Sequence, residues 1–189
     1  MALKYTCKHP IQLVGNEVIN QIHSNSLEVL AEVGLCLHDE AALNLLEGNG
    51  CLVDREKSVV KIPTHLMEEC LAKVPKEFTL QARNPLHNIQ FKEGIVQFGP
   101  CSGMKVVNLE TGALRSGTFK DVEETSRLCD AMDVMAGTNG GLGYMEDCPH
   151  ETNLVCMYYA TIQNSEKVFS LGAMDDSVKW GIRMAQVMG

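Results

Sequence analysis

The sequence predicts an α/β fold, in which an N-terminal α+β region is followed by the first βα units of an incomplete TIM-type (β/α)8 barrel. Three patterns support this. Helical spacing of apolar residues dominates residues 16–75, and short strand-like runs divided by turn residues fill 77–116. From about residue 133, apolar strands alternate with helices. We therefore predict two domains, residues 1–117 and 118–189.

Two helices are predicted first. Apolar residues recur at helical spacing over 16–33, and Gly34 is placed to end that helix. Asp39 is a suitable N-cap for a second helix over 39–48, because its short side chain can accept a hydrogen bond from a free backbone N–H. The N-terminal region therefore begins as a helical segment.

A strand and a third helix come next. Val59–Ile62 is a short apolar run, and Pro63 is suited to open a helix that Pro75 closes. Residues 77–116 then hold short apolar runs separated by Asn-Pro, Glu-Gly, Gly-Pro and Thr-Gly pairs. This rhythm predicts a small antiparallel sheet.

The chain from Thr118 onward has the order of an α/β barrel. Thr118 and Asp121 resemble a capping box at the start of a helix. Strands beginning near Val134 and Val168 are each followed by a helix, and this order implies parallel strands joined by right-handed crossovers. Two parallel strands make no stable sheet, and eight units need roughly 250 residues. We therefore expect the chain to be the front part of a longer protein.

Composition excludes several classes of protein. The 189 residues carry 16 Lys+Arg and 24 Asp+Glu, a net charge of −8, which argues against nucleic acid or an anionic membrane as partner. A hydrophobic content of 45% argues against disorder. There are eight cysteines but no CxxC pair, signal peptide or long apolar stretch. These features predict a cytoplasmic protein with reduced thiols.

Glu146 and Asp147 are the candidate substrate-binding residues. They lie between the first parallel strand and the helix opened by Pro149, where βα loops of barrels build active sites. Carboxylates there can bind a cationic substrate such as a quaternary ammonium. The alternatives are that Asp147 caps the helix that follows and that Glu146 is merely solvated. Asp175 and Asp176 hold the matching place after the second strand, with the same alternatives.

Two other motifs carry weaker signals. The run GTNGGLG over 137–143 lacks both the Gly-Lys-Ser/Thr ending of a phosphate loop and the spacing of a dinucleotide fingerprint, so we interpret its glycines as turn residues. Cys148 and His150, with Cys156 on the next helix, fit the spacing of no closed zinc site. We predict no metal site in this chain.

Several stretches together resemble the N-terminal part of the trimethylamine methyltransferase family. The resemblance runs through nearly all of the sequence, and the most specific piece is Phe98-Gly99-Pro100-x-x-Gly103 followed by Leu109-Glu110-Thr111-Gly112. The other pieces are Ile22-His23 with Ser26–Leu30 and Glu32–Gly34, Lys61-Ile62-Pro63, Ala72–Lys76, and Arg83-Asn84-Pro85.

The resemblance implies an α/β-barrel enzyme that moves a methyl group from a methylated amine or betaine to the cobalt of a separate corrinoid protein. It implies no cofactor bound directly by the chain, a corrinoid supplied by that partner, and a homo-oligomeric parent. The pyrrolysine of the trimethylamine branch is encoded downstream of these residues, so no catalytic residue is carried over, and the chain alone is expected to be inactive. The alternatives are a catalytically silent module that binds a ligand or partner, and another α/β-barrel enzyme.

Overall fold

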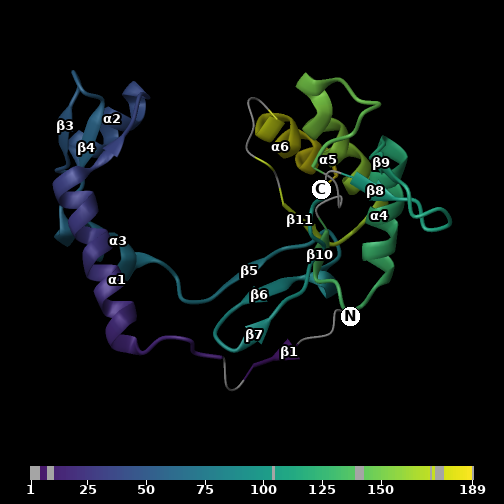
Figure 1. Cartoon of the computed structure of the whole chain (residues 1–189), viewed down its shortest axis with the longest axis horizontal. Coiled ribbons are helices and arrows are strands. Elements are labelled where there is room, and N and C mark those ends of the chain that lie inside the picture. Colours follow the sequence, from purple (N-terminus) through teal and green to yellow (C-terminus); the bar gives the residue numbers. More distant parts are fainter. Residues whose placement is uncertain are drawn as a thin grey trace. The chain divides into compact units, whose positions relative to one another are not determined.

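The computed structural model describes residues 5–7, 11–103, 105–138, 143–170, 172 and 177–188. Their helices and short strands give a mixed α/β protein, as predicted, and Figure 1 labels most of them along the chain. Contacts divide the chain into two compact units, one of residues 9–76 and one of 1–8 with 77–189. The predicted boundary at 117/118 marks the expected start of the barrel and stays a prediction.

The first unit begins with a long helix that changes its winding. α1 (Asn16–Glu28) continues as a π-helical turn over Val29–Val33, and Gly34 ends it, as predicted. Gly34 has a φ of 85°, and a Cβ there would lie 2.4 Å from the Val60 carbonyl oxygen. Only glycine allows the chain to pass so close to the neighbouring strand.

A three-stranded antiparallel sheet lies beside that helix. Its strand order is β2-β4-β3, and the strands are β2 (Leu35–Cys36), β3 (Leu52–Asp54) and β4 (Val59–Lys61). Sequence patterns predicted only β4, which lies in the four-residue run Val59–Ile62, whereas β2 and β3 are too short for alternation to show. Leu43, Cys51 and Val60 form the buried centre of the unit.

The two remaining helices of this unit begin where the sequence indicated. α2 (Glu40–Gly48) is capped by the Asp39 carboxylate, which accepts a hydrogen bond from the Ala42 N–H at 2.7 Å. α3 (Thr64–Lys73) follows Pro63. Both predictions are confirmed.

The second unit contains three separate antiparallel pairs instead of the single small sheet predicted for 77–116. The pairs are β1 (Tyr5–Thr6) with β7 (Ile95–Val96), β5 (Phe78–Leu80) with β6 (Ile89–Phe91), and β8 (Lys105–Val107) with β9 (Leu114–Ser116). A 3-10 turn, Pro85–His87, lies between β5 and β6. The single sheet was wrong because β5–β6 and β8–β9 each close on themselves as hairpins, while the segment after β7 takes a different partner.

The segment after β7 pairs with the parallel part of the fold. β10 (Gly137–Thr138) and β11 (Val168–Phe169) pair in parallel, as predicted. Phe98 forms a parallel bridge with Met135, and the Ala136 N–H donates to the Phe98 carbonyl at 2.8 Å. Three extended segments thus lie in the order Phe98, β10, β11. The described ranges hold no closed barrel, and the barrel stays a proposal.

Helices cover one face of these parallel segments. α4 (Phe119–Ala131) packs along α5 (Asn153–Asn164), which follows a 3-10 turn (His150–Thr152), and α6 (Ser177–Met188) packs on α5 (Figure 1). Val122, Met145 and Tyr158 form the centre of this core, each at most 1% exposed. No helix within the described ranges is long and apolar enough to cross a membrane.

A buried lysine closes the C-terminal end of α4. The Lys167 ammonium donates to the Cys129 carbonyl at 2.7 Å and to the Met132 carbonyl at 2.8 Å. Those carbonyls have no partner within the helix, and a cation there also complements the helix dipole. Burial lowers the pKa of Lys167, while Asp130 opposes that shift. Lys167 therefore ties the start of β11 to α4.

Candidate functional site

The loop after β10 is fixed to the start of α5 by one buried amide side chain. Asn153 accepts a hydrogen bond from the Met145 N–H at 3.1 Å, and its Nδ2 donates to the carbonyls of Met145 at 2.7 Å and Cys148 at 3.3 Å. Both Asn153 and Met145 are buried. The two predicted site carboxylates lie between these anchored residues, so their backbone is held in place.

The structure gives Asp147 a definite partner. Its Oδ1 accepts a hydrogen bond from the Phe119 N–H at 2.8 Å. Asp147 therefore does cap a helix, as the alternative proposed. The helix is α4, however, and not the one after Pro149. Asp147 reaches a free N–H at the start of α4, where a negative charge is favourable.

Glu146 lies beside the same helix end. Its N–H donates to the Gly117 carbonyl at 2.9 Å, while its side chain is exposed and close enough to Arg115 to raise the pKa of that guanidinium slightly, after the larger effect of Asp121. Whether Glu146 and Asp147 bind a substrate stays a prediction. The structure places both at the N-terminal end of α4.

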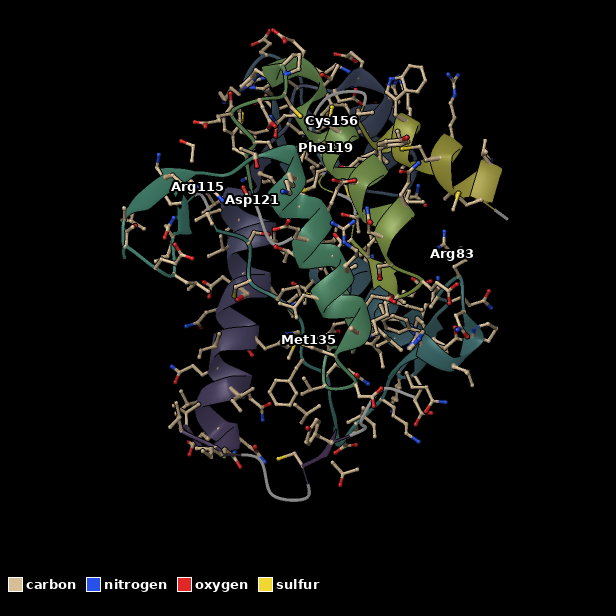
Figure 2. All side chains as sticks on the ribbon, turned by 90° about the vertical axis from the view of Figure 1, so that its right-hand side faces the viewer. Arg83, Arg115, Phe119, Asp121, Met135 and Cys156 are labelled. Atoms are coloured by element: carbon tan, nitrogen blue, oxygen red, sulfur yellow. The ribbon has the colours of Figure 1, made fainter. Side chains whose placement is uncertain are left out.

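Arg115 and Asp121 form a bidentate ion pair beside this loop (Figure 2). The guanidinium donates to both carboxylate oxygens at 2.6 Å, and Asp121 also accepts from the Thr118 N–H at 2.8 Å and hydroxyl at 2.6 Å. The predicted pairing of Thr118 with Asp121 is confirmed. The Arg115 guanidinium holds the pKa of the Asp121 carboxyl far below its usual range.

This pair predicts acid sensitivity. Because the pKa of Asp121 is lower in the folded chain than in the unfolded one, its stabilising effect is complete above about pH 4 and is lost as the pH falls further. We expect Asp121→Asn to lower the free energy of unfolding by about 1 kcal/mol near neutral pH, because it removes the charge that pairs with Arg115. Urea unfolding should show this difference shrinking toward about pH 3. A difference that grows on acidification would contradict the assignment.

A hollow lies on the other face of the parallel segments. The Phe169 ring is 6.5 Å from that of Tyr158 in the helical core, so Val168 and Ser170, one position to either side, face away from the helices. There they line a hollow of about 220 Å3. Its other lining residues are Ile89, Phe91, Gln97–Pro100 and Ala136–Thr138.

The hollow is mostly apolar, with two aromatic rings and a few polar groups. The Tyr5 ring packs edge-on against Phe98, with 5.1 Å between centroids. A Cβ at Gly137 would lie 2.7 Å from the Val168 carbonyl oxygen, so glycine permits this close strand approach. Sequence reasoning missed Phe91 and Phe98 as site residues. The available signal was the Phe98-Gly99-Pro100 motif, which was interpreted as part of a sheet.

Not all of the predicted site residues are brought together. Neither Glu146 nor Asp147 lines the hollow. Asp175, Asp176 and the centre of the glycine-rich run, 139–142, lie outside the described residues. Within the part of the chain that the structure describes, no group of three His, Cys, Asp or Glu side chains is arranged to hold a metal ion. His150 instead lies 6.2 Å, ring to ring, from Tyr144.

These observations define a mixed α/β protein with parallel βα units and a small aromatic hollow against the strands. It also has an anchored loop, residues 145–148, which carries Glu146 and Asp147 and is called the acidic loop below. Comparison with known proteins narrows this class to one family. The sequence model of the trimethylamine methyltransferase family matches residues 3–189. The chain belongs to that family.

Individual relatives agree with this family membership. The chain is 35% identical over 123 residues to a trimethylamine methyltransferase of Desulfitobacterium hafniense DCB-2, covering 64% of this chain and 24% of the relative. It is 29% identical over 157 residues to the glycine betaine methyltransferase of D. hafniense Y51, covering 83% and 32%. For a Methanosarcina thermophila trimethylamine methyltransferase the identity is 30% over 124 residues, covering 64% and 26%. The matches thus span a quarter to a third of each relative.

Proposed function

We propose that this chain is the N-terminal part of a methyltransferase that moves a methyl group from a methylated amine, such as trimethylamine or glycine betaine, to the cobalt of a corrinoid protein. The observation that carries the proposal is the family match over residues 3–189. Under it, the three parallel segments are the first strands of a TIM-type barrel, and the complete enzyme is a cytoplasmic homo-oligomer.

The chemistry requires an acceptor from outside the chain. A methyl group leaves nitrogen as a cation equivalent, so its acceptor must be a very strong nucleophile. Burial raises the pKa of the Cys51, Cys129 and Cys148 thiols, and so disfavours the thiolates that would attack. Reduced cobalt in a corrinoid supplies the required nucleophilicity, and the enzyme's own task is to hold and orient the amine.

The size and lining of the hollow suit a small amine. Its volume of about 220 Å3 is below the roughly 300–1,000 Å3 of pockets that hold drug-sized ligands, so a corrinoid does not fit in it. An ammonium group over an aromatic ring gains about 0.5–2 kcal/mol. Phe91 and Phe98 offer such rings, while Gln97 and Ser170 add polar groups. We propose the hollow as the place where the methylated nitrogen binds.

The test is a spectroscopic assay of cob(I)alamin consumption with trimethylamine, glycine betaine, carnitine and proline betaine. The complete enzyme containing this sequence should methylate the corrinoid with at least one of these substrates. The chain of 189 residues alone should show no turnover. Methyl transfer by this chain alone, or demethylation by the complete enzyme without a corrinoid, would show that the mechanism is wrong.

Phe98 provides a sharper test of the site. In the complete enzyme, we expect Phe98→Ala to weaken substrate binding between about twofold and thirtyfold, which corresponds to the cation–π range. Phe98→Tyr should retain most of the affinity. Tyr159→Ala is the matched control, since Tyr159 is 49% exposed, against 48% for Phe98, and does not line the hollow. Calorimetric titration that finds equal affinity in Phe98→Ala and Tyr159→Ala would remove Phe98 from the site.

The predicted role of the acidic loop can be tested separately. Asp147→Asn keeps an oxygen that can accept from the Phe119 N–H but removes the charge, and Glu146→Gln does the same for its neighbour. If the carboxylates attract a cationic substrate, both variants should keep their melting temperature and lose affinity. Glu110→Gln, in the exposed β8–β9 turn, is the control for a general change in net charge. Unchanged affinity in both loop variants would leave Asp147 with its capping role alone.

A further inference from the structure

Two cysteines meet at the end of the acidic loop. Cys148 is the last residue that Asn153 anchors, and Cys156 lies three residues after Asn153, on the adjoining turn of α5. The Cys148 and Cys156 side chains are neighbours, and both pack on the same apolar cluster. Both are free thiols. Figure 2 shows Cys156 at the same end of the helix pair as Phe119 and Asp121.

The two thiols differ in their access to solvent. Cys148 is buried, with 9% of its surface exposed, whereas Cys156 is half-buried. A small oxidant in solution therefore reaches Cys156 first. Cys148 is its buried neighbour and can serve as the resolving thiol.

We infer that Cys148 and Cys156 form a redox-active dithiol, which a peroxide converts into an intramolecular disulfide. Hydrogen peroxide first oxidises the Cys156 thiol to a sulfenic acid and is itself reduced to water. The Cys148 sulfur then attacks the Cys156 sulfur, and the sulfenic hydroxyl leaves with the Cys148 proton as a second water. Two thiols are oxidised and one peroxide is reduced, so atoms and electrons balance.

The electrostatics make Cys148 a poor first target of peroxide and slow the closing step. Burial, the Cys156 side chain and the charge of Asp147 together raise the pKa of Cys148 to about 11. At neutral pH Cys148 is therefore a neutral thiol, which is a poor first target for peroxide. It carries the proton that the departing hydroxyl needs. Because the thiolate is the attacking form, the disulfide should close faster as the pH rises.

The disulfide would join the loop after β10 covalently to α5. Asn153 already ties the loop to that helix through the Met145 and Cys148 backbone. Closing such a short ring restricts the loop further. Glu146 and Asp147 lie just before this ring, between Cys148 and the Met145 anchor, so oxidation would hold the acidic loop more firmly at the N-terminal end of α4. This inference concerns the chain's own residues and does not depend on the proposed methyl transfer.

Peptide mapping tests the bond directly. After mild peroxide treatment, free thiols of the full chain are blocked with N-ethylmaleimide, and a glutamyl endopeptidase cleaves after Glu146, Glu151 and Glu166. The peptides 147–151 and 152–166 each carry one of the two cysteines. We expect them as one linked species, lighter than their sum by two hydrogens, that separates on addition of dithiothreitol. Amide exchange over 145–149 should slow several-fold and recover with dithiothreitol.

Three variants distinguish the outcomes. Cys156→Ser should abolish the linked species, and Cys148→Ser should leave a Cys156 sulfenic acid that dimedone traps. Cys101→Ser, at an exposed cysteine, should still form the link. The wild-type map decides the question even if a variant folds poorly. Recovery of both cysteines as blocked thiols, or of Cys156 as a sulfinic acid with Cys148 still free, would overturn the inference.

Discussion

Replacing Tyr158 with alanine should lower the free energy of unfolding of the second unit by about 3–5 kcal/mol, as expected when a large buried aromatic residue is removed. Tyr158 is 1% exposed at the centre of the core between α4, α5 and β11. Its hydroxyl donates to the Gly172 carbonyl at 2.6 Å. The change would therefore leave a cavity and remove the link from α5 to the chain beyond β11.

Thermal and urea unfolding will measure the stability lost in Tyr158→Ala. Two control variants separate the contribution of the ring from that of the hydroxyl. Tyr158→Phe keeps the ring and removes only the hydroxyl, so it should cost about 1 kcal/mol. Tyr159→Ala removes an adjacent tyrosine that is 49% exposed, and should cost much less than Tyr158→Ala. If the two alanine variants were equally stable, the second unit would not have its core at Tyr158.

Asn153→Ala should also destabilise the second unit strongly, by about 1–3 kcal/mol, because it leaves buried backbone groups without partners. The Met145 N–H and the Cys148 carbonyl lose the bond to Asn153, while the Met145 carbonyl keeps only the 3.5 Å bond from the Cys148 N–H. Since these groups anchor the acidic loop, we also expect faster amide exchange at Phe119, whose N–H donates to Asp147.

Asn153→Asp distinguishes the hydrogen bond that Asn153 accepts from the two that it donates. A carboxylate can still accept from the Met145 N–H but cannot donate to the two carbonyls. Unfolding measurements should therefore find Asp at least as destabilising as Ala, because an ionised group is also buried. A fully stable Asp variant would show that the two carbonyls are satisfied in some other way.

The parts of the fold that could be predicted are those with local signals. Asp39 and Thr118 cap the helices they were expected to cap, and Gly34 ends its helix, because each effect depends on a few neighbouring residues. The parallel pairing of β10 with β11 also followed from the order strand, helix, strand. Residues whose role is set by their own short segment were predictable.

The sequence predictions that were wrong concern contacts between segments that are distant in the chain. Phe98 was placed in an antiparallel sheet, but its partner is Met135, which no local pattern identifies. For Asp147, the alternative to substrate binding was a cap on the helix that follows it, but its carboxylate instead reaches back to α4. Both partners are chosen by the packing of the whole unit, and a carboxylate before a helix looks the same in sequence whichever helix end it contacts.

In the candidate site too, features with a local sequence signal were predicted and those formed by distant segments were not. Glu146 and Asp147 were selected by position, and they lie between β10 and α5, shortly before the 3-10 turn that precedes α5. The aromatic rings of the hollow come from two segments of different types, β6 and the stretch after β7. Because β6 belongs to a hairpin and Phe98 to the parallel segments, no single sequence motif contains both rings.

The bridge from Phe98 to Met135 also bears on the order of folding. The β8–β9 hairpin closes over a few residues, and α4 forms from contacts within itself, so both can form early. The bridge spans both of them, and its closure costs the entropy of a long loop unless that intervening chain has already become compact. Phe98 should therefore join β10 after the hairpin and helix have formed, which makes the first parallel pairing of the chain a late folding event.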